Sequence, residues 1–252
     1  MNGGRDTPTD GPATYELEEP IARITMDDGK VNALSIEMLG ALHGALDQAE
    51  RDGAVVLLAG REGYLSAGFD LKVFAAGGEG VLEMLTLGAT LYERMLSFPR
   101  PVVLACTGHA VAAGAFLTLA ADVRVGAEGP FQIGMNEVRI GLTLPWFAIE
   151  IARHRMHPAH FDRAVIGAAM YGPAEALEPG FLDETAPPGE VLERALGLAR
   201  GMSELNAAAH AATKLRARGR VLEALRTAIE TELTPQGLSI EQSEAPLRPG
   251  RH

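Results

Sequence analysis

Cysteine, lysine and aromatic residues are all scarce in this chain of 252 residues. The single cysteine, Cys106, rules out a disulfide bond within the chain and fits a reducing compartment. Lysine occurs only at Lys30, Lys72 and Lys214, and the formal net charge is −11. Because proteins that bind nucleic acid present a basic face or stripe, this acidic composition argues against a nucleic-acid partner.

Long apolar runs are missing as well. Each apolar run is shorter than the ~18 residues that a membrane-spanning helix needs. The first twelve residues, MNGGRDTPTDGP, contain no apolar segment of the kind found in secretory signals. We therefore expect a cytoplasmic protein with no membrane partner.

What the sequence does contain is enough apolar material for one large core. The hydrophobic fraction is 47% and the aromatic fraction 5%, so the core must be built mainly from Ala, Leu, Val and Met. Polar sequence rich in Gly, Pro and Thr predicts a flexible tail over 1–13, and similar sequence predicts another over 236–252. Between them we expect an α/β core over 14–200 and a helical region over 201–235.

Strand and helix signals alternate in the first part of the chain. Short apolar runs predict strands at 22–27, 54–60, 101–108 and 122–127. Helical spacing of apolar residues predicts a helix capped by Ser35, followed by helices at 81–98 and 113–122. After residue 145 the signals are helical, at 145–156, 158–168, 173–178, 189–203 and 205–233. Buried strands separated by helices indicate an α/β fold.

Three familiar site patterns are incomplete. GYLSAG lacks the glycine two residues before Ser66 that a hydrolase nucleophile turn requires. AAGGEG lacks the Lys-Ser/Thr that completes a phosphate-binding loop. His154, His157 and His160 have spacing that metal ligands on a helix could use, but Pro158 interrupts that helix. An exposed basic corner is the simpler interpretation of these histidines.

Two longer segments point to a known family. The first segment, residues 57–74, reads as a strand and a loop that contains S-A-G-x-D-L: LLAGREGYLSAGFDLKVF. The second segment, residues 99–125, reads as a strand, a turn and a helix of small residues: PRPVVLACTGHAVAAGAFLTLAADVRV. Together they resemble the enoyl-CoA hydratase/isomerase, or crotonase, family over roughly residues 13–235. The resemblance implies a spiral of ββα units with a helical C-terminal part that drives association into a homotrimer or a dimer of trimers. It also implies an acyl-CoA thioester substrate and no cofactor beyond the coenzyme A of that substrate.

The resemblance further implies an oxyanion hole, made of two backbone N–H groups that hold the thioester oxygen. These match Ala67 and Ala113, with Gly68 and Gly114 beside them allowing backbone to approach the ligand. Many family members have a run of glycines where this chain has Ala112-Ala113-Gly114. The methyl group of Ala113 raises the question of how wide the hole is.

Glu137, within GMNEVRIGL, matches one of the two glutamates of the family's hydratases. The other position is occupied here by Phe116. Hydration suits a pair of carboxylates, whereas a double-bond shift needs one base that returns the proton as an acid. An apolar wall that excludes water favours the shift, and Phe116, Leu144, Trp146 and Phe147 could supply one. The pattern around Glu137 is also similar to that of the Δ3,Δ2-enoyl-CoA isomerases, although a salt bridge to a nearby arginine is an alternative role.

The remaining binding residues follow from the resemblance alone. They are expected in the coenzyme A groove, at the phosphates, beside the oxyanion loop or around the acyl group: Val31, Ala33, Leu34, Asp70, Leu71, Lys72, Phe74, Leu144 and Trp146. Asp70 is interpreted as a structural cap of its loop. Partial burial is expected to raise the pKa of Glu137 and strengthen it as a base.

Three functions stay open at this point. The first is an acyl-CoA double-bond isomerase, which moves the double bond of a 3-enoyl thioester to position 2. The second is a hydratase or another enzyme of the crotonase family. The third is a subunit that binds coenzyme A thioesters without turnover. No motif in the sequence specifies the length of the acyl chain, the metabolic pathway, or whether trimers pair into hexamers.

Overall fold

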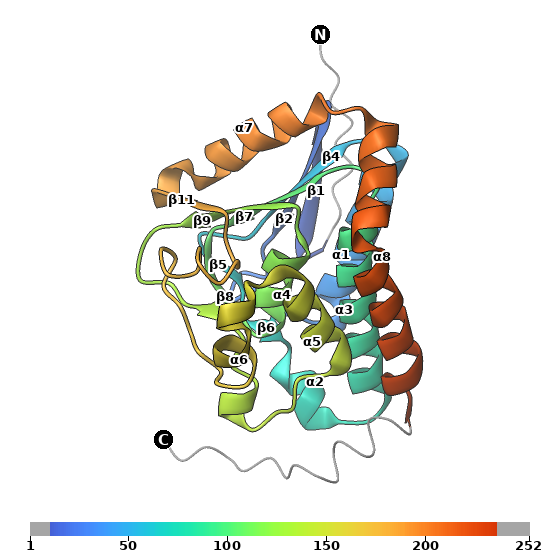
Figure 1. The fold of residues 1–252 in the computed structure, drawn as a ribbon, viewed down its shortest axis with the longest axis vertical. Helices are drawn as coiled ribbons and strands as arrows, with labels where there is room; N and C mark the ends of the chain where they lie inside the picture. Colours follow the sequence, from blue (N-terminus) through green and yellow to red (C-terminus); the bar gives the residue numbers. More distant parts are fainter. Residues whose placement is uncertain (1–10, 236–252) are drawn as a thin grey trace.

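The computed structural model describes residues 11–235. The predicted tail at 236–252 and most of that at 1–13 lie outside the described residues. Ala13, expected at the end of the first tail, is instead the buried first residue of strand β1. The fold is the α/β arrangement that the sequence predicted (Figure 1).

A six-stranded sheet forms the centre of the molecule, in the order β1-β2-β4-β7-β9-β11. Its strands are β1 (Ala13–Glu18), β2 (Ile21–Met26), β4 (Val55–Ala59), β7 (Val102–Cys106), β9 (Val123–Ala127) and β11 (Glu184–Ala186). All neighbours pair in parallel except β1 with β2. Strands β4 and β7 are buried along their whole length, as expected for strands covered on both faces.

Two small sheets lie beside the large one. One has the order β10-β8-β5, from β5 (Gly63–Ser66), β8 (Gly108–Val111) and β10 (Ile133–Gly134). The other pairs β3 (Ala33–Leu34) with β6 (Gly68–Phe69). The chain thus repeatedly passes from the large sheet to a small sheet and then to a helix. This repetition confirms the predicted spiral of ββα units.

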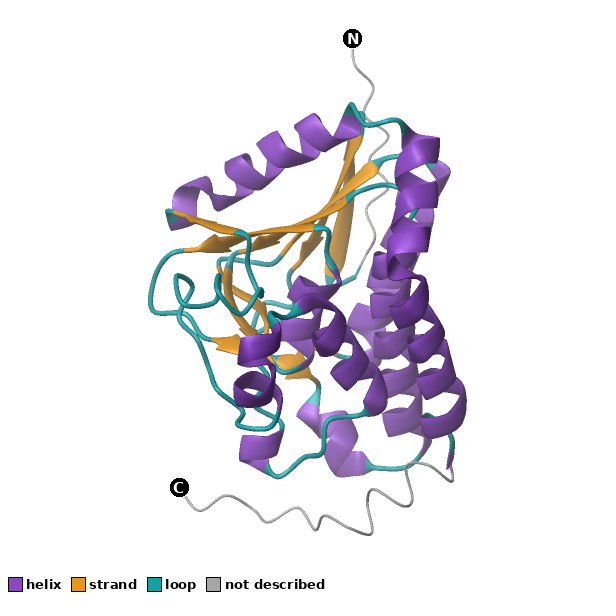
Figure 2. Ribbon diagram, in the orientation of Figure 1, coloured by secondary structure: helices purple, strands orange, loops and turns teal. Residues whose placement is uncertain are grey.

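Helices cover both faces of the large sheet. α7 (Val191–Ser203) packs on one face through a small apolar cluster that includes Val55, Val103 and Val191. The other face carries the main core, with α1 (Ile36–Arg51), α3 (Glu79–Ser97), α4 (Ala113–Ala120), α5 (Trp146–Arg155) and α8 (Ala207–Glu232) (Figure 2). The short helices are α2 (Leu71–Ala76), α6 (Pro158–Val165) and the 3₁₀ turns η1 (Val138–Ile140) and η2 (Pro188–Glu190).

Local signals placed most helix ends correctly. Ser35 caps α1 by accepting the N–H of Met38 at 3.1 Å. α5 ends before Pro158, which begins α6 as its first residue. The helix predicted at 173–178 was wrong, because that segment forms a series of turns between Pro173 and Pro179. Strand β11 was not predicted, since its residues, ETA, show no apolar alternation.

The C-terminal helix α8 packs on α3 and α5 of its own chain. The apolar residues Val221, Leu222 and Leu225 of α8 are buried, whereas Leu215 is 47% exposed. The predicted boundary between 200 and 201 falls inside α7. Association as a trimer or hexamer stays a prediction. Most of the large apolar side chains of α8 are already buried within one chain. No helix of the described part is long and apolar enough to cross a membrane.

Candidate active site

Glu137 follows strand β10 by three residues and immediately precedes the 3₁₀ turn η1. The carbonyl of Gly134, at the end of β10, accepts the N–H of Ala112 at 2.9 Å, which ties this segment to the start of α4. Beyond it, the carbonyl of Glu137 accepts the N–H groups of Ile140 at 3.1 Å and Leu142 at 2.9 Å. The backbone of Glu137 is therefore fixed on both sides of its side chain.

The carboxyl group of Glu137 lies in an apolar setting. Its Oε2 atom is buried and has no hydrogen-bond partner among the described residues. Burial raises the pKa of Glu137 from 4.5 to about 7. A carboxyl group with this pKa can accept a proton and return it near neutral pH.

The alternative role of Glu137, a salt bridge, receives no support from its surroundings. Within residues 11–235 no arginine, lysine or histidine forms an ion pair with it. The nearest arginine in sequence, Arg139, donates instead to the carbonyl of Ala168 at 3.1 Å. The carboxyl group is thus left for another partner.

Ala113 begins helix α4 and offers one backbone donor. The first N–H groups of a helix have no acceptor within the helix, and they carry the positive end of its dipole. In the described part of the chain no acceptor is recorded for the N–H of Ala113. Its side chain is 1% exposed and belongs to the core, so the methyl group packs inward. These observations support Ala113 as one donor of the oxyanion hole.

The N–H group of Ala67, expected as the second donor, is already used inside the protein. It donates to the carbonyl of Val31 at 3.0 Å. A ligand oxygen would have to break this hydrogen bond to bind there. The structure therefore contradicts the assignment of Ala67 to the oxyanion hole.

Phe69 offers the better placed second N–H group. Asp70, which follows it, donates its N–H to the carbonyl of Leu34 at 3.3 Å and so faces β3. Along a strand successive N–H groups point to opposite sides, so the N–H of Phe69 faces away from β3. A Cβ atom on Gly68 would lie 3.3 Å from the N atom of Ala113, so this turn contacts the start of α4. Sequence reasoning missed Phe69 because the pairing of β3 with β6 decides which N–H is available.

Gly68 and Gly114 have a role different from the one expected. Gly68 has a φ of +99°, which favours glycine, and a Cβ atom there would lie 2.9 Å from the Cβ of Ala112. A Cβ atom on Gly114 would lie 2.4 Å from the carbonyl oxygen of Ser66. Their missing side chains thus let two protein segments touch, rather than making room for a ligand.

An aromatic cluster lies beside these groups. Phe116, Tyr92 and Phe147 are each at most 2% exposed. The ring of Tyr92 lies 5.9 Å from that of Phe116 and 6.3 Å from that of Phe147. Burial and, to a smaller extent, the charge of Glu137 raise the pKa of Tyr92, so Tyr92 lies within electrostatic range of the carboxyl group. Phe116, expected at the position of the second glutamate of hydratases, is therefore part of a buried aromatic cluster near the carboxyl group.

Leu144 and Trp146 differ in how far their side chains are exposed to solvent. Leu144 is buried, at 6% exposure, as expected for a residue of an apolar wall. Trp146 is 60% exposed at the first position of α5, and its backbone N–H donates to Oε2 of Glu232 at 2.8 Å. The structure thus contradicts the placement of Trp146 in an enclosed wall, whereas Phe147 beside it is buried.

The residues expected around coenzyme A are divided between surface and core. Val31 is 37% exposed and Leu71 is 64% exposed, Ala33 is half-buried and Lys72 is exposed. Leu34 is fully buried and contributes its side chain to the core, which contradicts its placement in the groove.

The short helix α2 begins at the cap that the sequence suggested. Asp70 caps α2 by accepting the N–H of Lys72 at 2.9 Å, which confirms its structural interpretation. The ring of Phe74 meets that of Phe69 edge-on at 6.3 Å between centroids. Exposed Lys72 is thus the second residue of α2, and Phe74 on the same helix contacts Phe69 in the oxyanion turn.

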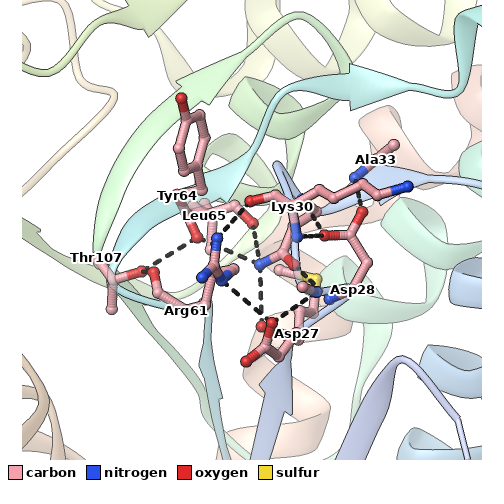
Figure 3. A network of polar contacts seen from close by, with 11 residues as sticks. Asp27, Asp28, Lys30, Ala33, Arg61, Tyr64, Leu65 and Thr107 are labelled. Atoms are coloured by element: carbon pink, nitrogen blue, oxygen red, sulfur yellow. Dashed lines mark hydrogen bonds and ion pairs between the residues drawn. The ribbon is translucent and has the colours of Figure 1, made fainter.

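Residues 27–33 form a closely hydrogen-bonded loop (Figure 3). The carboxylate of Asp28 accepts the N–H groups of Lys30, Asn32 and Ala33 at 2.8 to 3.0 Å. Burial alone would raise the pKa of Asp28, but these N–H groups lower it overall. Arg61 pairs with Asp27 at 3.1 Å and donates to the carbonyl of Lys30 at 2.6 Å.

Asn32 is the centre of this loop and was not singled out by the sequence. It is fully buried, and its side-chain amide donates to the carbonyls of Met26 at 2.9 Å, Leu65 at 3.2 Å and Tyr64 at 3.3 Å. Its φ of +52° is a left-handed conformation that asparagine tolerates better than most residues. The segment that carries Val31 is thereby held rigidly beside the oxyanion turn.

The histidines at 154, 157 and 160 lie apart from this site. His157 caps α6 by accepting the N–H of Ala159, and His160 lies 3.4 Å from a carboxylate oxygen of Glu178. Among residues 11–235 no group of three His, Cys, Asp or Glu side chains could hold a metal ion.

Comparison with known proteins places the chain in a family. Residues 16–245 match the family model described as enoyl-CoA hydratase/isomerase. A solved enoyl-CoA hydratase from Mycobacterium marinum is 44% identical, with a TM-score of 0.84, over 87% of this chain and 97% of that one. A solved structure of a Mycobacterium tuberculosis protein named enoyl-CoA isomerase is also 44% identical, with a TM-score of 0.84, over 87% of this chain and 96% of that one. A second solved structure of the same protein carries the name probable enoyl-CoA hydratase. The mouse mitochondrial enoyl-CoA delta isomerase 1 is 29% identical over 74% of this chain and 64% of its own length. Relatives of equal similarity therefore carry both activities in their names.

Proposed function

This chain belongs to the enoyl-CoA hydratase/isomerase family, and we propose that within it the protein is an acyl-CoA double-bond isomerase. One observation carries the proposal. The buried carboxyl group of Glu137 has its pKa raised to about 7 and lies near an aromatic cluster, where the resemblance to hydratases would call for a second acid. The similarity of isomerases to this chain supports the same choice but does not decide it.

The proposed reaction uses one side chain and two backbone donors. Glu137 removes a proton from C2 of a 3-enoyl thioester, and the electron pair moves onto the thioester oxygen to form an enolate. The N–H groups of Ala113 and Phe69 hold this oxygen, and each such donor contributes about 10²–10³-fold in rate. Glu137 then returns the proton to C4, so the double bond moves from C3–C4 to C2–C3 with no net loss of protons.

The aromatic cluster supports this reaction by limiting water. Hydration requires a water molecule held and deprotonated beside C3, which is work suited to two carboxylates. Phe116 offers no hydrogen bond for such a water. The coenzyme A part of the substrate is proposed to lie along Val31, Ala33, Leu71 and Lys72. The ammonium group of Lys72 would contact its phosphates, which an otherwise acidic protein would repel.

A direct assay tests the proposal. Purified protein is given a 3-enoyl-CoA and, separately, a 2-enoyl-CoA, and both isomerisation and hydration are measured. We expect isomerisation by the wild type, and a loss of at least 10³-fold in kcat for Glu137→Gln, because the amide keeps the shape but not the basicity. Acyl-CoA binding by the variant should be largely retained.

Other results would select other functions. Efficient hydration of the 2-enoyl thioester by the wild type would make the protein a hydratase. Binding without either reaction would favour the non-catalytic subunit. Unchanged turnover in Glu137→Gln would remove Glu137 from the mechanism.

A further inference from the structure

Tyr92 joins helix α3 to the first residue of α4. Its side chain is fully buried, and its hydroxyl group donates to the carbonyl oxygen of Ala113 at 2.7 Å. The ring is held between Phe116 and Phe147, with centroid distances of 5.9 and 6.3 Å. A rigid buried ring thus brings one polar atom to the backbone of the residue that carries a proposed oxyanion donor.

The start of α4 has few other polar restraints. The residue before the helix, Ala112, has no side chain that could cap it, and its φ of +52° is unfavourable for alanine. Its backbone N–H is held by Gly134 at 2.9 Å. Within residues 11–235, the bond from Tyr92 is the one side-chain hydrogen bond recorded to Ala112 or Ala113.

Small displacements matter at this position. A backbone donor stabilises a developing negative charge only if it already points at the oxygen, since reorienting it during the reaction costs free energy. Loss of accurate placement by about 1 Å can lower a rate by roughly 10²-fold. A hydrogen bond that fixes Ala113 can therefore raise the reaction rate as well as stabilise the fold.

Tyr92 also lies within the electric field of the acid–base group. Burial and the charge of Glu137 both raise the pKa of Tyr92, so its hydroxyl keeps the proton that it donates to Ala113. One side chain is thus coupled to both halves of the proposed site. Because its pKa is raised, Tyr92 is a poor candidate for a nucleophile or a general base.

We propose that Tyr92 is a positioning residue of the oxyanion hole, which holds Ala113 so that its N–H points at the thioester oxygen. This inference rests on the proposed function in that both use the same oxyanion hole. It assigns no bond-making step to Tyr92, because its hydroxyl proton is committed to Ala113.

The test is Tyr92→Phe, which removes the hydroxyl and keeps the ring contacts. Tyr171→Phe is the matched control, since Tyr171 is also buried, at 4% exposure, and its hydroxyl has no partner among the described residues. We expect kcat for isomerisation to fall about tenfold or more in Tyr92→Phe, with KM changed less than about twofold, because placement is lost mainly in the transition state. Tyr171→Phe should leave both values near those of the wild type.

A second measurement does not depend on isomerisation. A 3-oxoacyl-CoA bound in an oxyanion hole shifts toward its enolate, which absorbs in the near ultraviolet. We expect this absorbance with the wild type and with Tyr171→Phe, and its clear reduction with Tyr92→Phe at saturating ligand. Circular dichroism and thermal unfolding confirm that both variants are folded.

These measurements separate the two proposals. A wild type that forms the enolate but does not isomerise, with the enolate lost in Tyr92→Phe, would support the role of Tyr92 and overturn the isomerase. Unchanged kcat and unchanged enolate absorbance in folded Tyr92→Phe would overturn the role of Tyr92. A wild type that binds the 3-oxoacyl-CoA without forming its enolate would overturn it too, because no oxyanion hole would be there to position.

Discussion

At the scale of single residues, Glu137 shows how a group suited to proton transfer destabilises the fold. Its pKa is raised from 4.5 to about 7 because burial disfavours the charged form. Below pH 4.5 the carboxyl is protonated in both the folded and the unfolded chain. As the pH rises toward 7 the unfolded chain ionises readily and the folded chain resists, so stability falls.

This gives a pH-dependent expectation for Glu137→Gln. Well above pH 7 the variant should be more stable than the wild type by about 3 kcal/mol, since a shift from 4.5 to about 7 is about 2.5 pKa units at about 1.4 kcal/mol each. Near pH 4.5 the two proteins should be about equally stable. Urea unfolding at pH 4.5 and pH 8 measures the difference, and the kcat/KM of the wild type should rise as the pH passes through about 7.

A stability difference that does not change between the two pH values would contradict this view. It would mean that Glu137 ionises as easily in the folded as in the unfolded chain. The raised pKa would then not explain its proposed use as a base.

Residue-level predictability was uneven for a physical reason. Glu137 could be found from the sequence because a carboxylate among apolar neighbours is conspicuous and lies in a motif. The Phe69 N–H could not, because every residue but proline has an N–H, and strand pairing decides where it points. Leu34 and Trp146 were misplaced for a related reason, since a motif does not show which way a side chain faces.

At the scale of elements, helix α5 depends on a cap supplied by another helix. Pro145, which precedes α5, has no side chain that could accept the N–H of Trp146. Glu232, the last residue of α8, does so through Oε2 at 2.8 Å. The negative charge also suits the positive end of the α5 dipole.

We expect Glu232→Ala to lower the free energy of unfolding by about 1 kcal/mol, the usual cost of losing a helix cap. Glu232→Gln should lose less, because its amide oxygen can still accept the N–H. Glu230→Ala is the control, since Glu230 is exposed on the same helix. Urea unfolding of the three variants makes the comparison, and an equal effect of Glu230→Ala would rule out a specific cap.

Elements were predictable where local signals were strong. The apolar periodicity of α1, α3 and α8 and the apolar runs of β4 and β7 gave their positions from the sequence. Strand β11 depends on pairing with β9 and leaves no local pattern. The segment 173–178 has helix-forming residues, but the prolines and glycines around it favour turns.

At the scale of the whole molecule, a buried ionic group joins the sheet to the C-terminal helix. Asp122, just before β9, lies 2.7 Å from Lys214 and 2.8 Å from Arg218, both on α8. It also accepts the N–H of Val102 in β7 at 2.7 Å. Burial lowers the pKa of Lys214 to about 8 although Asp122 opposes this, which shows how costly the charge would be without its partner.

We therefore expect Asp122→Ala to destabilise the protein by about 3–5 kcal/mol, because two buried cations lose their carboxylate. Arg226→Ala is the matched control, since its ion pair with Glu93 joins α8 to α3 at the surface. That control should cost at most about 1 kcal/mol. Urea unfolding distinguishes them, and equal costs would show that Asp122 is not the principal ionic anchor of α8.

The same anchor has a consequence for how the chain is made. Synthesis proceeds from the N-terminus, so Asp122 leaves the ribosome well before Lys214 and Arg218. During that interval the sheet can pair its strands, but Asp122 is without its two cations and the apolar surfaces of α3 and α5 are without α8. A nascent chain stopped before residue 214 should therefore remain dependent on chaperones, since exposed apolar surface promotes aggregation.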